Sequence, residues 1–127
     1  LIAYLYWVST QGNPVQRLGY SYWAERSYDF IRPMIDTVRG KMNLAPSDMT
    51  FFFAHSHVDE KHARDVTRVL TEVCRTEEDW AAVRRTAEMT LRLTLQILEQ
   101  VYGEYVKLRD GLPSAYECLN VAAPPST

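Results

Sequence analysis

The chain has 127 residues, a net charge of −2, 46% hydrophobic and 24% charged side chains, which fits one modest globular domain and not two. The absence of a basic block excludes the usual nucleic-acid binders, and no apolar run is long enough to span a membrane. Cys74 and Cys118 show no metal-binding spacing, so we expect reduced thiols in a cytoplasmic protein without a signal peptide.

The first segment, residues 1–10, has the pattern of the end of a helix, but it begins without an initiator Met or a capping residue. We therefore expect that polypeptide upstream is absent from this chain or is supplied by another chain. Gly12 and Asn13 should stop this helix. Pro14 suits the first position of a second helix, which we expect to run to about Met42 with a kink or local break at Pro33.

Residues 43–47 predict a connection, after which Ser47 or Thr50 could cap a helix that runs to about Arg75. Thr76 precedes the acids at 77–79, a combination typical of a helix start because a capping hydroxyl and first-turn carboxylates both satisfy the helix N-terminus. The last helix should run to about Arg109.

The last predicted helix carries an apolar stripe, and we expect this stripe to face the core. Its residues are Trp80, Val83, Ala87, Leu91, Leu95, Leu98, Tyr102 and Tyr105. Strand patterns are nearly missing, and short connections between long amphipathic helices indicate antiparallel neighbours in a bundle. The sequence thus predicts an all-α fold, with a helical domain over residues 1–113 and a C-terminal tail over residues 114–127 that ends loosely.

Three ionisable residues of the helix before Arg75 are the strongest indication of function. At about 100° per residue, His55, Asp59 and His62 point to roughly 0°, 40° and −20°, so they share one narrow face. That face also holds apolar residues and should point inward; they are Phe51, Phe52, Val66, Val69, Leu70 and Val73. Burying such charges without a partner is costly, and a bound cation satisfies all three together. The spacing therefore indicates a metal site.

A metal-free interpretation stays open, because a buried histidine can be satisfied by hydrogen bonds and an Asp can pair with a histidine directly. His57 serves as an internal control, since it points about 200° away from His55 and should lie on the solvated face. The residues Ser56, Glu60, Lys61, Arg64 and Arg68 share that solvated face.

Two imidazoles and a carboxylate suit iron, manganese or zinc, and the lack of a thiolate argues against a structural zinc site. A further carboxylate should come from a neighbouring helix, and Glu25 is the leading candidate because it follows Leu18 and Tyr22 at helical spacing. Asp29, one turn later, is the second choice. Glu25 could instead be a surface acid, paired with Arg26 or Arg32.

At this point the chain resembles the haem-oxygenase-like non-haem di-iron oxidases and oxygenases. The resemblance rests on Gly12-Asn13-Pro14, on Leu18-Gly19-Tyr20, on Glu25 and on the pattern His55-x-x-x-Asp59-x-x-His62, and it covers residues 1–105. It implies a compact helical bundle in which Glu25, His55, Asp59 and His62 are iron ligands. It also implies an enzyme that uses dioxygen and an external reductant, in biosynthesis, to oxidise a small molecule such as an amine, amino acid or fatty acid. The implied reactions are N-oxygenation, oxidative C–C cleavage or desaturation.

The family pattern also requires a Glu and a His on an earlier core helix, and no residue of this chain fills that role. The resemblance therefore covers the C-terminal half of a family domain, without its N-terminal helices. It implies that an N-terminal half or a second chain supplies the missing ligands for two irons, and that the bundle is a homodimer. Among the nearby aromatic residues, Tyr22, Trp23, Phe51 and Phe52 could line a substrate pocket, although such residues are more often plain core.

Two other functions fit the same bundle. Relatives of the haem-oxygenase-like fold include metal-free thiaminase-like and cofactorless enzymes, which use other pocket residues. The chain could also be a non-catalytic helical interaction module, in which the trio forms a buried polar network.

Overall fold

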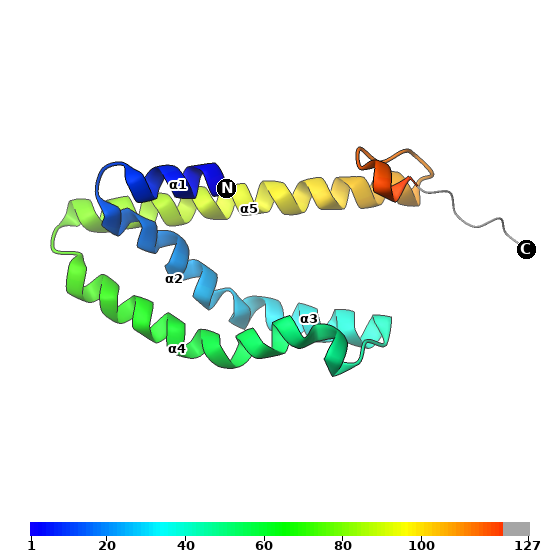
Figure 1. Cartoon of the computed structure of the whole chain (residues 1–127), viewed down its shortest axis with the longest axis horizontal. Helices are drawn as coiled ribbons and strands as arrows, with labels where there is room; N and C mark the ends of the chain where they lie inside the picture. Colours follow the sequence, from blue (N-terminus) through cyan, green and yellow to red (C-terminus); the bar gives the residue numbers. More distant parts are fainter. Residues whose placement is uncertain (121–127) are drawn as a thin grey trace, which may run out of the picture. The chain divides into compact units, whose positions relative to one another are not determined.

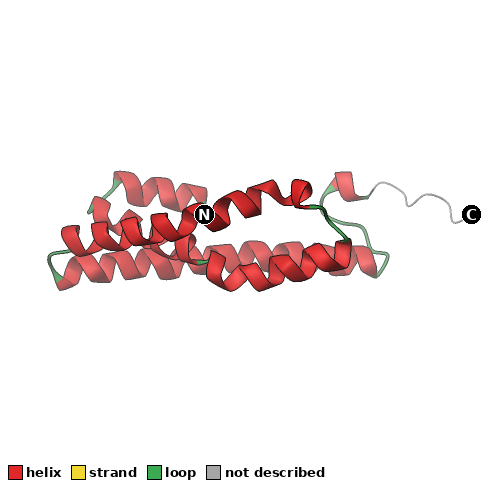
Figure 2. Cartoon of the chain, turned by 90° about the horizontal axis from the view of Figure 1, so that it is seen from below, coloured by secondary structure: helices red, strands yellow, loops and turns green. Residues whose placement is uncertain are grey.

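A computed structural model describes the backbone of residues 1–120 and the side chains within that range, except those of residues 28, 29, 53 and 55–60. All regular structure in this range is helical, as Figure 2 shows. The α-helices are α1 (Ile2–Thr10), α2 (Leu18–Arg26), α3 (Tyr28–Met42), α4 (Thr50–Val73) and α5 (Glu77–Arg109), and the short 3-10 helices are η1 (Pro14–Arg17), η2 (Pro46–Met49) and η3 (Glu117–Leu119) (Figure 1). The predicted all-α class is confirmed.

The chain divides into two compact units, Leu1–Leu91 and Arg92–Thr127, and α5 contributes to both. The first unit holds α1 to α4 and the first turns of α5. The second unit holds the rest of α5 and the segment after it. No helix among the described residues is both long enough and apolar enough to cross a lipid bilayer.

The turn between α1 and η1 follows the prediction made for Gly12 and its neighbours. Gly12 has a φ of 70°, a left-handed conformation that costs glycine little. The Asn13 side chain accepts a hydrogen bond from the Val15 amide at 3.0 Å, and Pro14 opens η1. The Gln16 side chain donates to the carbonyl of buried Val8 at 3.1 Å, which ties the turn back to α1.

The single helix predicted from Pro14 to Met42 is wrong, because the chain breaks at Ser27 between α2 and α3. The Ser27 hydroxyl donates to the Ala24 carbonyl at 2.8 Å and so competes with the backbone hydrogen bonds of the helix. Pro33 lies inside α3, which continues past it. The break therefore comes earlier than the proline, at a side chain that offers the backbone an alternative hydrogen bond.

The predicted capping of α4 is also wrong, since neither Ser47 nor Thr50 caps it and Met49 precedes its first turn without a side-chain bond. Instead η2 intervenes, and the Asp48 carboxylate accepts the Ala45 amide at 2.8 Å. The helix start predicted at Thr76 is confirmed, because α5 begins at the next residue. The Thr76 hydroxyl accepts the Asp79 amide at 3.1 Å, while the Asp79 carboxylate accepts the Thr76 amide at 3.0 Å.

Asp79 gathers several donors at the N-terminus of α5. Its carboxylate accepts the Arg75 amide at 3.0 Å, the Thr76 hydroxyl at 2.9 Å and the Asn13 side chain at 2.6 Å. The pKa of Asp79 is lowered, first by the Arg75 amide and then by the Thr76 hydroxyl and amide. This acid therefore fixes the α4–α5 turn and links it to the turn after α1.

The core of the first unit lies where α2, α4 and α5 meet. Leu70 on α4 and Cys74, which directly follows α4, pack with Val83 on α5, and Leu18 on α2 packs against them. Burial raises the pKa of the Cys74 thiol, with a further contribution from the Asp79 charge, so this cysteine stays protonated at neutral pH. Both cysteines are free, as the sequence predicted.

Gly19 is a point of close approach between α2 and α5. A Cβ atom added there would overlap the Val83 carbonyl oxygen and would lie 2.8 Å from the Ala87 amide nitrogen. One turn further along α2, the Trp23 indole donates to the Thr90 hydroxyl at 2.7 Å. Thr90 is fully buried. Backbone contact and a buried hydrogen bond thus fix α2 against α5, and hence the position of Glu25 two residues later.

Only part of the apolar stripe predicted on α5 is buried. Val83 is buried together with Ala82, Thr86 and Thr90, whereas the side chain of Trp80 is exposed. From Leu91 onward the remaining stripe residues are exposed as well; they are Leu91, Leu95, Leu98, Tyr102 and Tyr105. The expectation that the whole stripe faces a core within this chain is therefore wrong for the described residues.

The second unit is held by polar contacts. The Glu104 carboxylate accepts the Ser114 hydroxyl and the Ala115 amide, each at 2.7 Å, and pairs with Lys107 at 2.7 Å. These contacts lower the pKa of Glu104 to about 2, and the hydrogen bond from Lys107 contributes most. The Asn120 side chain accepts a hydrogen bond from the Ser114 backbone amide through Oδ1 and donates one to the Ser114 carbonyl through Nδ2. The segment after α5 is thus anchored as far as 120, and the ending predicted to be loose lies outside the described residues.

Candidate metal centre

Glu25 and His62 meet across the α2–α4 contact. Nδ1 of His62 lies 3.2 Å from Oε2 of Glu25, within hydrogen-bond distance, although the residues are far apart in the sequence. The Glu25 side chain is 28% exposed and that of His62 is 49% exposed. The pair therefore lies at the rim of the helix packing, where a solvent-borne ion can reach both side chains, and not in the deep core expected from the sequence.

The packing around the pair explains why it forms. Glu25 lies in the last turn of α2, just before the Ser27 break, and His62 lies in the middle of α4. Arg26 is drawn elsewhere, because its guanidinium stacks over the Tyr22 ring at 5.0 Å and lies 3.5 Å from the Thr67 hydroxyl. The alternative in which Glu25 pairs with Arg26 at the surface is therefore not what the structure shows.

The other predicted ligands cannot be placed. α4 is an unbroken helix across positions 55, 59 and 62, but the side chains of His55 and Asp59 lie outside the described residues, as do those of Asp29 and His57. Among the side chains that are described, no group of three His, Cys, Asp or Glu residues is close enough to hold a metal ion. The structure brings together two of the four predicted ligands, and the full set stays a prediction.

The contact between Glu25 and His62 fits a metal site as well as a hydrogen bond. Two donors bound at right angles to one ion, each about 2.1 Å from it, lie about 3 Å apart. The 3.2 Å between Nδ1 and Oε2 is close to that separation. A carboxylate oxygen and an imidazole nitrogen also form the donor set that iron and zinc accept, whereas magnesium and calcium prefer oxygen alone. The donor chemistry of the pair is thus compatible with iron.

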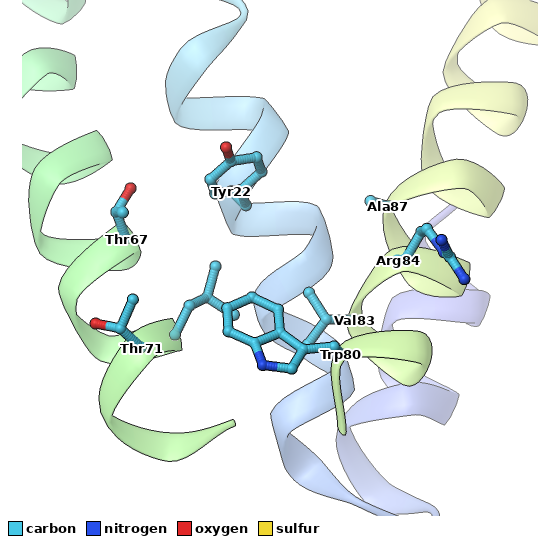
Figure 3. Close-up of a pocket in the computed structure, with 8 residues that line it drawn as sticks. Tyr22, Thr67, Thr71, Trp80, Val83, Arg84 and Ala87 are labelled. Carbon is cyan, nitrogen blue, oxygen red and sulfur yellow. The ribbon is translucent and has the colours of Figure 1, made fainter. Parts of the chain in front are cut away.

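An open groove of about 350 Å³ lies where α2, α4 and α5 diverge, near Tyr22. Its lining is mostly apolar, with Trp80 across one side and Thr67 and Thr71 on α4 facing it (Figure 3). Arg84 lines the opposite edge, and its guanidinium turns away from α4 in this view. Tyr22 also lines a second groove of about 530 Å³, whose other lining residues are Trp23, Arg26, Ser27, Phe30, Ile31 and Leu91.

The aromatic residues predicted near the site differ in their surroundings. Tyr22 lines both grooves and Trp23 lines the second, beside the helix turn that carries Glu25. Phe51 is 64% exposed and Phe52 is 37% exposed, so the expectation that these two face the interior is wrong. They lie at the start of α4, where their rings pack edge to face, 5.5 Å apart. Their role as pocket residues stays a prediction.

Several residues beside the site were not found from the sequence. Thr67, Thr71 and Trp80 line the groove, and Arg26 links two of its walls. The spacing of Thr67 and Thr71 by one helical turn was available as a signal, but polar residues at that spacing usually belong to a solvated face. The sequence predicts Trp80 in the core, because an aromatic residue on an apolar stripe normally packs there.

Comparisons with known proteins identify the family and the fold of this chain. A family model described as an iron-containing redox enzyme, of the haem-oxygenase type, matches residues 1–95. A crystal structure of a domain of unknown function with a haem-oxygenase-like fold, from Shewanella denitrificans, is 49% identical, with a TM-score of 0.83. The match covers 91% of this chain and 50% of that chain, so this chain spans about half the length of the solved domain. A search of curated proteins finds no match.

Proposed function

Because this chain belongs to the haem-oxygenase-like family of iron-containing redox enzymes, we propose that it provides part of an iron site that activates dioxygen to oxidise a small molecule. The observation that carries the proposal is the 3.2 Å contact between Glu25 and His62. It joins a carboxylate on α2 to an imidazole on α4, at two of the four positions predicted as ligands. The remaining proposed ligands are His55 and Asp59 on the same helix as His62.

Each ligand has a role that follows from its charge. Glu25 and Asp59 supply negative charge, which favours the more oxidised state of a bound iron, and His55 and His62 are neutral donors that leave the site's net charge low. The iron, when bound, supplies the electron transfer to dioxygen, with an external reductant restoring it. In the structure, the contact between Nδ1 of His62 and Oε2 of Glu25 turns the imidazole ring towards α2, so that these two atoms could face the same ion.

The grooves beside Tyr22 support a small-molecule substrate. They are mostly apolar, with a few hydroxyls and cationic groups, which is the usual composition of a ligand site. We propose an amine, amino acid or fatty acid as the substrate class, oxidised by N-oxygenation, C–C cleavage or desaturation. The complete centre in this proposal holds two irons, with a further Glu and His from an N-terminal half-domain or a second chain.

Iron retention followed by oxygen uptake tests the proposal. The chain is loaded with Fe(II) without oxygen, unbound iron is removed by gel filtration, and oxygen consumption is recorded with ascorbate present. We expect the wild type to retain iron and consume oxygen, and the variants Glu25→Gln, His62→Gln and His55→Ala to lose both. Asp65→Asn is the matched control, because this carboxylate also lies on α4 but pairs with Lys61 at 2.9 Å.

The alternatives give different results in the same experiment. A metal-free enzyme or a non-catalytic interaction module retains no iron, and its melting temperature is the same with iron and with a chelator. Iron retention that is unchanged in His62→Gln would contradict the proposed ligand set.

A further inference from the structure

The part of α5 in the second unit carries a wide apolar surface that nothing in the described part of the chain covers. We name it the α5 arc, and it consists of Leu95, Leu98, Val101, Tyr102, Tyr105 and Leu108. These side chains are exposed even though they are large and apolar; Leu98 is 60% exposed and Tyr102 is 64% exposed. Single exposed apolar residues are ordinary, but a contiguous patch of this kind marks an interaction site.

The spacing within the α5 arc indicates that its partner is helical. Leu95, Leu98, Tyr102 and Tyr105 recur at intervals of three, four and three residues, the seam spacing by which one helix packs along another. At about 100° per residue the full arc spans about 140° of the helix circumference, wider than the single stripe needed for one neighbour. The arc is therefore wide enough to pack against two neighbouring helices of one partner.

The chain's own C-terminal segment folds onto a different side of α5. It is anchored by Glu104, which bonds to Ser114 and Ala115, and by the Gln100 side chain, which donates to the Tyr116 hydroxyl at 3.2 Å. Relative to Leu98, positions 100 and 104 are turned by about 200° and 240° around the helix. This segment thus occupies the polar side and leaves the arc open as far as residue 120.

We propose that the α5 arc is the docking surface for a helical half-domain like the half of the Shewanella denitrificans domain that this chain does not match. That domain shares 49% identity with this chain, and the match takes up 50% of its length. As much polypeptide again is therefore present in a protein of the same fold, and a helical layer is what the arc needs. The inference deepens the proposed function, because the same half-domain is the proposed source of the missing Glu and His.

Co-expression tests the proposal with a defined probe. The unmatched half of the Shewanella denitrificans domain is co-expressed with this chain, and the mass of the product is measured by light scattering with a chelator present. We expect a one-to-one complex for the wild type. Leu98→Glu and Tyr102→Glu should each weaken it at least tenfold, whereas Gln96→Glu, on the polar side of the same helix, should leave it unchanged.

Several results would overturn the proposal. These are a complex that survives Leu98→Glu, a wild-type chain that stays monomeric beside soluble probe, and a homodimer that excludes the probe and is broken by Leu98→Glu. The last result would assign the arc to a second copy of this chain.

If the probe is insoluble alone, it is joined to this chain by a flexible linker. The fusion should melt at a higher temperature than the chain, and Leu98→Glu should remove that increase. An equal melting temperature of fusion and chain would count against the proposal.

The test separates docking from iron binding. Glu25→Gln is expected to form the complex normally, because Glu25 lies on α2 and the α5 arc does not include it. A wild-type complex that forms but retains no iron would overturn the proposed function alone, and iron retention by the wild-type chain without a complex would overturn only this inference.

Discussion

The two halves of α5 have similar apolar patterns but different surroundings. Before Leu91 the helix packs against α2 and α4, with Val83, Thr86 and Thr90 buried, whereas beyond Leu91 most of the large apolar side chains are exposed. In the first half the close approach at Gly19 and the hydrogen bond to Trp23 fix a neighbouring helix. The contrast shows that an apolar stripe predicts the need for a partner but does not tell which polypeptide provides it.

The largest difference between the two regions should appear on truncation of leucine. Leu70→Ala removes a side chain that is 3% exposed and leaves a cavity in the core, so we expect the free energy of unfolding to fall by about 2–5 kcal/mol. Leu98→Ala, at 60% exposure, should change it by no more than about 0.5 kcal/mol in the chain alone. Urea denaturation of both variants measures this, and an equal loss would show that Leu98 is covered.

Glycine substitutions should have opposite signs in the two regions. Gly19→Ala places a Cβ against the backbone of Val83 and Ala87, and we expect a loss of about 1–3 kcal/mol in stability because two helices must move apart. Gly103→Ala meets no atom within 4 Å, so it should stabilise the helix by about 0.5–1 kcal/mol. Thermal unfolding of both variants checks the signs. Stabilisation by Gly19→Ala would rule out the close α2–α5 contact.

The smallest effect concerns the polar anchor of the second region and depends on pH. The pKa of Glu104 is lowered from 4.5 to about 2 by its contacts with Lys107, Ser114 and Ala115. The stabilisation from this carboxylate is therefore fully present above pH 4.5 and is lost as the pH falls towards 2. Melting temperatures of the wild type and Glu104→Gln should differ at pH 7 and converge near pH 2. A difference that is constant across this range would contradict the anchor.

Much of the fold was predictable because the signals are local. The helix start at Thr76, the turn at Gly12 and the helix over residues 50–73 all depend on neighbouring residues, and all were found. The break at Ser27 is not predicted from the sequence, because Pro33 is the stronger helix breaker on its local signal. The exposure of the stripe beyond Leu91 could not be predicted, since burial depends on polypeptide packed against the helix and not on the helix itself.

The candidate site was predictable to a lesser extent. Helical spacing placed His62 on one face of α4, but only tertiary packing could bring Glu25 to it, 3.2 Å away. The sequence also left Arg26 as an alternative partner for Glu25, and its stacking on Tyr22 depends on a rotamer that spacing does not determine. His55 and Asp59 remain predictions from spacing.

The affinity of the chain for Fe(II), measured by anaerobic calorimetry together with the melting temperature, tests the central claim that Glu25 and His62 form part of an iron site. The account predicts that Glu25→Gln and His62→Gln each weaken iron binding at least tenfold, while Asp65→Asn binds as the wild type does. It would be contradicted if either ligand variant bound iron as tightly as the wild type, or if the wild type bound none while both variants melted at lower temperature. The contact would then be a structural hydrogen bond alone.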